Sequence, residues 1–317
     1  MINSVRNTVL SVLNKNNYGY ISPSDFNLYA KQAQMEFYDE YFSNYNKIVN
    51  MENARMSNVD YADMRKKAEE NMEFFMVTKF LHHSHLNKFY IPSLTTTGDE
   101  AYMINRVMYH YNQLLSGTNS AIAIGKLIDA AATFTSSGIS VGDFVLNKAT
   151  SESAEIIAID SGTQLTISDS IFTAPATAYS IVDAEDAEIA EKVSNSRITM
   201  LNQSLLTSPS EMFPAYSQDD GRVVLYPKTA NEYGAVVANY FRYPKDPKWT
   251  YILISGGEPM FDQSQPDYQD FELPLEDEYK LVVKILQYCG ISIREADVSN
   301  FAMFQEQHEQ PSFSQKQ

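Results

Sequence analysis

The stretch KLIDAAATFTSSGISVGDFVLNKATSESAEIIAIDSGTQLTISDSIFTAPATAYSIVD, residues 126–183, differs in pattern from the rest of the chain. Short apolar runs alternate in it with the turn-forming groups SSG, GD, DSG and TAPA. Turns at intervals of roughly 8–12 residues are typical of a small all-β barrel or sandwich. We therefore predict an inserted, barrel-like β domain over residues 121–183.

The flanking regions contain apolar residues at helical spacing. Ser22 and Pro23 form a typical helix start, and an apolar stripe follows them. The stripe comprises Phe26, Ala30, Ala33, Phe37 and Tyr41. Similar spacing predicts a second helix over roughly 58–82 and two more at about 275–289, where Gly290 would end the helix, and 294–309. We expect these helices to form a bundle that is the core of the fold.

Other segments predict strands outside the insert. AYMINRVMYHY (101–111) fits a strand, and GRVVLYPKT and AVVANYFRYP predict two strands joined as a hairpin. A Pro- and Gly-rich stretch after them, up to ELP, predicts an extended arm. The predicted fold class is α+β: a helical bundle core with an attached antiparallel β region and the inserted β domain. Residues 1–120 hold the bundle and first strand, and residues 184–317 hold the β region, the arm and the C-terminal helices that complete the core.

The composition argues against several classes of function. The chain has 24 Lys and Arg against 40 Asp and Glu, a net charge of -16. This balance argues against a protein that binds nucleic acid through clustered cations. A single cysteine excludes an internal disulfide framework. No apolar run approaches the ~18 residues of a membrane span, and no secretory leader is expected. The 21 Tyr and 17 Phe, beside one Trp, indicate extensive contact surface.

No catalytic, cofactor-binding or metal-binding site is predicted. The group His82, His83 and His85 fits a helix end better than a metal centre. Cys289 falls on an apolar helical stripe, as expected of a buried thiol. The acids Glu272, Glu276, Asp277 and Glu278 fit a helix start. Phosphate-loop, dinucleotide-binding and nucleophile-elbow motifs are absent.

A strip of cations and aromatics is the candidate interaction site. It comprises Arg242, Tyr243, Lys245, Lys248 and Trp249. Such residues could stack on single-stranded nucleic acid. Two prolines make the strip extended, a form that docks into protein grooves, and we favour pairing with an acidic neighbouring copy. Arg294, at the start of the last predicted helix, is a further candidate for pairing with a neighbour.

Four segments of the chain resemble a known family. They are NYGYISPSDFNLYAKQAQMEFYDEYF, KVSNSRITMLNQSLLTSPSEMFPAY, NYFRYPKDPKWTYI and DFELPLEDEYKLVVKILQYCGISIRE. They are similar to a virion protein of crAss-like tailed phages of gut Bacteroidetes. That protein is a ring protein of the neck, the head–tail connector beneath the portal. The resemblance covers most of the chain outside residues 121–183.

The resemblance implies a non-enzymatic adaptor of the tail-tubular kind. Such a protein forms a homo-oligomeric ring of twelve copies in the virion, is assembled in the host cytoplasm, and contacts the portal protein and other neck rings. Double-stranded DNA passes through the ring without specific binding, since an acidic lumen repels its phosphates. The alternatives are another tail ring, a fibre-attachment protein, or a glycan-binding or hydrolytic tail protein.

Overall fold

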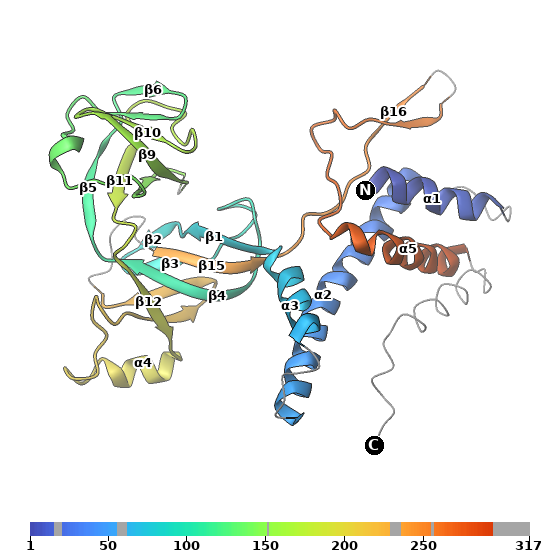
Figure 1. Cartoon of the computed structure of the whole chain (residues 1–317), viewed down its shortest axis with the longest axis horizontal. Coiled ribbons are helices and arrows are strands. Elements are labelled where there is room, and N and C mark those ends of the chain that lie inside the picture. The colour runs from blue at the N-terminus through green and yellow to red at the C-terminus, as the bar shows by residue number, and fades with distance from the viewer. Residues whose placement is uncertain (16–20, 56–61, 151, 229–235, 255–256, 294–317) are drawn as a thin grey trace. The chain divides into compact units, whose positions relative to one another are not determined.

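The computed structural model describes residues 1–15, 21–55, 62–150, 152–228, 236–254 and 257–293, and it divides into two compact units (Figure 1). The helical unit combines Met1–Phe74 with Pro244–Gln317, and the β unit is Phe75–Tyr243. The chain therefore leaves the helical unit after Phe74 and returns to it at Pro244, which makes the β unit an insertion within the helical unit.

The larger sheet of the β unit has eight strands in the order β1-β15-β4-β12-β13-β14-β3-β2. All neighbours are antiparallel except β12 and β13. The strand predicted at 101–111 is confirmed as β4. The bounds are β1 Met76–Phe80, β2 His83–His85, β3 Lys88–Tyr90, β4 Ala101–His110, β12 Ala187–Lys192, β13 Ala215–Asp219, β14 Arg222–Tyr226 and β15 Val236–Arg242.

A second sheet of seven strands, in the order β5-β11-β8-β9-β10-β7-β6, lies in the same unit and has its own apolar core. It begins at Gln113, upstream of the insert predicted from the sequence. A small cluster that includes Phe80, Val237 and Leu146 joins the two sheets. The bounds are β5 Gln113–Thr118, β6 Ala121–Ala123, β7 Lys126–Ile128, β8 Phe144–Asn147, β9 Ser153–Ser161, β10 Gln164–Ile167 and β11 Ala178–Val182, with the 3-10 turn η1 at Phe134–Ser136.

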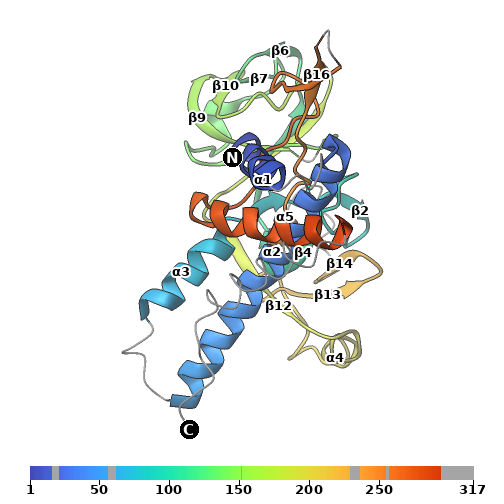
Figure 2. The ribbon, with the colours of Figure 1, turned by 90° about the vertical axis from the view of Figure 1, so that its right-hand side faces the viewer.

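The helical unit is built on α2, which packs side by side with α3 and also contacts α5 (Figure 2). The predicted start of α2 is confirmed, because the Asp25 backbone N–H donates to Ser22 Oγ over 3.1 Å. Its predicted apolar stripe is buried throughout. The bounds are α1 Ile2–Lys15, α2 Pro23–Arg55, α3 Ala62–Glu73, β16 Tyr251–Leu253, β17 Pro259–Phe261, the 3-10 turn η2 Leu275–Asp277 and α5 Glu278–Ile293; α4, Asn195–Leu201, belongs to the β unit.

The predicted fold class, with a helical bundle as the core, is wrong. The described residues form sheets of eight, seven and two strands, and the larger sheets have apolar cores of their own. The helix expected over 58–82 ends at Glu73, and residues from Met76 onward pair with β15 instead. Partners distant in sequence therefore decide the conformation here, against the local helical spacing.

The hairpin expected between GRVVLYPKT and AVVANYFRYP is also wrong. These segments are β14 and β15, and three strands separate them in the sheet. Strand β14 instead forms a hairpin with β13, turning at Asp220 and Gly221 with φ values of 44° and 68°. Positive φ at both positions suits an Asp-Gly turn.

The end of the chain differs from expectation as well. Gly290 was expected to end the helix, but α5 continues through it to Ile293. The helix predicted at 294–309 and the candidate Arg294 lie outside the described residues.

Candidate interaction surfaces

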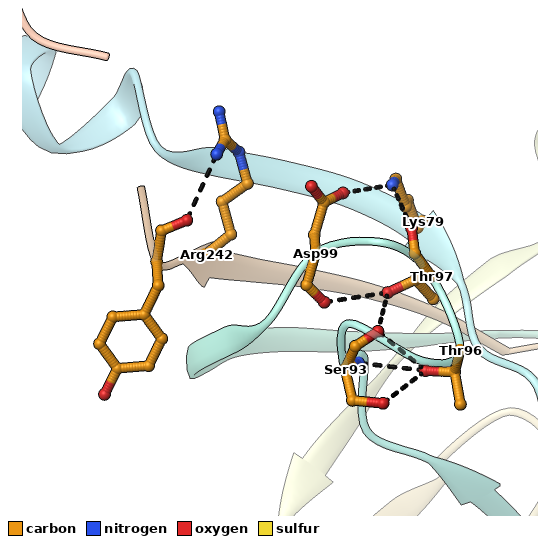
Figure 3. A network of polar contacts seen from close by, with 7 residues as sticks. Lys79, Ser93, Thr96, Thr97, Asp99 and Arg242 are labelled. Atoms are coloured by element: carbon orange, nitrogen blue, oxygen red, sulfur yellow. Dashed lines mark hydrogen bonds and ion pairs between the residues drawn. The ribbon is translucent and has the colours of Figure 1, made fainter. Parts of the chain in front are cut away.

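The first two residues of the predicted strip lie at the end of the β unit. Arg242 Nη1 donates to the Tyr243 carbonyl oxygen over 3.3 Å, and the ring of Tyr243 meets that of Tyr102 edge-on at 5.2 Å. Figure 3 shows this arginine near Asp99, which accepts a hydrogen bond from Lys79. Both strip residues are half-buried, so these contacts within the chain use part of their surface.

The two lysines of the strip lie in the helical unit, where the backbone is held in place. Gln34 Nε2 donates to the Lys245 carbonyl over 2.7 Å, and the Lys245 N–H donates to Glu272 over 2.8 Å. Lys248 forms an ion pair with Asp267. The lysine side chains remain exposed while the strip itself is anchored along α2.

Trp249 is buried in the helical unit, with 2% of its surface exposed. Arg6 of α1 lies over its ring at 3.8 Å, a cation–π geometry. The indole N–H donates to Asn3 over 3.1 Å, and the Trp249 backbone N–H donates to Asn27 over 2.9 Å. The spacing of the sequence does not show that the Trp249 side chain is buried.

The structure places Lys245, Lys248 and Trp249 of the strip in one unit. Their role in partner binding stays a prediction.

The sequence pattern predicts that the three histidines end a helix, and this prediction is wrong. His83 and His85 begin and end β2, and the His82 ring stacks on Tyr90 at 6.0 Å. Across the described ranges, no group of three or more His, Cys, Asp or Glu side chains has metal-binding geometry.

The predicted burial of Cys289 is confirmed, since 1% of its surface is exposed on α5. Burial raises the pKa of the thiol to about 12. Because the thiolate is the reactive form, we expect iodoacetamide at pH 8 to alkylate the folded protein on the order of 10³ times more slowly than the unfolded protein. Mass spectrometry of timed samples, with and without guanidinium, measures both rates. Equal rates would contradict a buried thiol.

An exposed apolar surface, which we call the α4 patch, lies on and after α4. Ile198 anchors the helix in a cluster with Val193 and Ala215. Leu201 also packs against this cluster, but most of the residues after it are exposed, and Leu205 and Leu206 are 101% and 97% exposed. The patch comprises Met200, Leu205, Leu206, Met212 and Phe213.

Hydrogen bonds within the loop hold the α4 patch in shape. The Ser208 N–H donates to the Ser204 carbonyl over 2.9 Å, around Leu205 and Leu206. Ser210 and Phe213 exchange two backbone hydrogen bonds of 3.2 Å, around Met212. The apolar side chains are therefore exposed on an ordered loop, which is typical of a binding surface.

A second exposed apolar surface is the hairpin β16–β17, which we call the arm. In Figure 1 it extends away from the helices of its own unit. Its base is fixed by Trp249, whose ring stacks on those of Tyr251 at 5.6 Å and Phe261 at 5.9 Å. Five apolar side chains of this segment are 42–68% exposed: Tyr251, Ile252, Leu253, Ile254 and Met260.

Two depressions in the described part of the helical unit differ from small-molecule pockets. Their volumes are about 310 and 300 Å³, and charged side chains such as Lys67, Glu276 and Glu36 line them. Ligand pockets are usually lined mainly by apolar side chains. The arm and the α4 patch are therefore the better candidates for a binding function.

No family model matches the chain, and no curated protein matches it. Within the described residues, no helix has the length and apolar character needed to cross a membrane. The resemblance to a neck protein of crAss-like phages therefore depends only on the four sequence segments that carry it.

Proposed function

We propose that the chain is a non-enzymatic virion protein that forms a ring in the head–tail connector of a tailed phage. In this role it joins the portal to the tail and surrounds the channel through which DNA leaves. The observation that carries the proposal is the pair of exposed apolar surfaces, the α4 patch and the arm, in separate units of one chain. Patches of this kind mark protein interaction sites.

The charge of the chain supports the same proposal. A net charge of -16 makes copies repel one another, so the contacts between them need apolar area or local charge complementarity. Both apolar surfaces meet that need. An acidic ring also lets double-stranded DNA pass without trapping it by counterion release. Another tail ring or a fibre-attachment protein would use the same surfaces, and a glycan-binding tail protein is less well supported.

We expect the purified protein to form rings when copies no longer repel one another. Raising the salt from 50 to 500 mM screens the acidic charge and is expected to increase the ring fraction. Negative-stain electron microscopy and sedimentation velocity measure that fraction, and gold labelling places the protein in the virion. Labelling coaxial with the portal supports the connector role. A monomer at every salt concentration with labelling on fibres or capsid faces would contradict it.

A further inference from the structure

We propose that the arm of one copy packs on the α4 patch of the next copy, forming a head-to-tail contact. This inference rests on the proposed ring and names the surfaces that hold it together. Two different surfaces that meet in this way form a heterologous interface, which closes into a ring when the rotation between copies permits. The occupant of the α4 patch is therefore a second copy of this chain.

The arm needs a partner because it is a hairpin with apolar side chains on both faces. Successive residues of a strand point to opposite faces, and Ile252, Leu253 and Ile254 are all exposed. Within the described residues, three residue pairs join the two strands, and backbone hydrogen bonds from Ile254 to Glu258 and from Asp262 to Thr250 extend the pairing at its two ends. An isolated hairpin of this size is marginal in water, so contact with another surface would stabilise it.

The charge of the arm identifies the kind of partner. The arm itself, residues 251–261, contains one acidic residue, Glu258, and no Lys or Arg, and three more acidic residues follow it at 262–270. Asp267 and Asp270 are each in an ion pair. Glu258 and Asp262 have no ion pair within the described residues. The surface that receives the arm should therefore be apolar with basic neighbours.

The α4 patch has that character, although the chain as a whole is strongly acidic. Residues 191–214 contain two basic residues, Lys192 and Arg197, and two acidic residues, Glu191 and Glu211, so the segment is locally neutral in a chain of net charge -16. Lys192 and Arg197 are exposed, and neither of them forms an ion pair with a described residue of the chain. Arg197 lies on α4 itself, beside the exposed Met200. The α4 patch thus matches the arm in apolar character, and Arg197 beside it complements Glu258 of the arm in charge.

Cysteine cross-linking tests this contact. In a Cys289→Ser background, one chain carries Leu253→Cys on the arm and a second carries Leu205→Cys on the α4 patch. With copper–phenanthroline as the oxidant, we expect disulfide-linked dimers when the two chains are mixed and monomers from either alone. A chain carrying both substitutions is expected to give a ladder of covalent oligomers on a non-reducing gel.

Charge reversal provides the matched control. Arg197→Glu or Glu258→Arg alone is expected to lower the cross-linked yield at least fivefold, and the two reversals together should restore most of it. Dimers from the Leu253→Cys chain alone, or a disulfide within one doubly substituted chain, would overturn the proposal. Rings without any arm–patch cross-link would overturn this contact and leave the ring intact. Cross-linked open filaments would support the contact and contradict the ring.

Discussion

Replacing Trp249 with alanine is expected to lower the free energy of unfolding of the helical unit by about 3–5 kcal/mol. The ring is 2% exposed, so its loss leaves a large cavity. The substitution also removes the cation–π contact with Arg6 and the hydrogen bond to Asn3. Urea unfolding followed by circular dichroism at 222 nm measures the change, since Trp249 is the only tryptophan and its fluorescence disappears with it.

Tyr251→Ala is the matched control for this prediction. Tyr251 stacks on Trp249 but is 42% exposed on the arm, so its loss should cost less than about 1 kcal/mol. Comparing the two variants distinguishes an aromatic side chain that stabilises the fold from one that is available to contact a partner. If Trp249→Ala left the unfolding midpoint unchanged but prevented assembly, its main role would be in partner binding, as the sequence had suggested.

Local sequence signals were sufficient for some elements of the fold. The start of α2 and its apolar stripe were predicted because a cap and a 3.6-residue period are local features. Strand β1 was missed because MVTKF follows α3 closely and its partner β15 lies some 160 residues away. The order of β14 and β15 in the sheet likewise depends on pairings that no local pattern reveals.

The candidate surfaces were only partly predictable for a related reason. The cationic strip was found from composition, but Trp249 is buried and Lys248 is paired within the chain. The α4 patch was missed because a Leu-Leu pair in a sequence looks the same whether its side chains are buried or exposed. Exposure depends on the packing of distant residues, so a surface made of apolar residues is the kind of site that sequence reasoning detects least well.

Gly117→Ala is expected to destabilise the β unit by about 2–4 kcal/mol. A Cβ atom at Gly117 would lie 2.6 Å from Asp129 Oδ2 and 2.7 Å from the Tyr179 hydroxyl oxygen. These two groups share a buried hydrogen bond of 2.7 Å, and the side chains are 5% and 0% exposed. Neither group can move aside without breaking that bond in the core of the seven-stranded sheet. Thermal unfolding and hydrogen exchange of the amides in β5 and β11 measure the loss.

Gly162→Ala is the matched substitution, because its Cβ would meet only Thr135 Oγ1 at 3.6 Å, an ordinary contact. We expect it to change the free energy of unfolding by less than about 0.5 kcal/mol. A double-mutant cycle with Tyr179→Phe then isolates the cause. Removing the hydroxyl relieves one of the two closest contacts, so Gly117→Ala should cost less in the Tyr179→Phe background than in the wild type. Equal costs in both backgrounds would show that the contact with Asp129, and not the one with the Tyr179 hydroxyl, makes the glycine necessary.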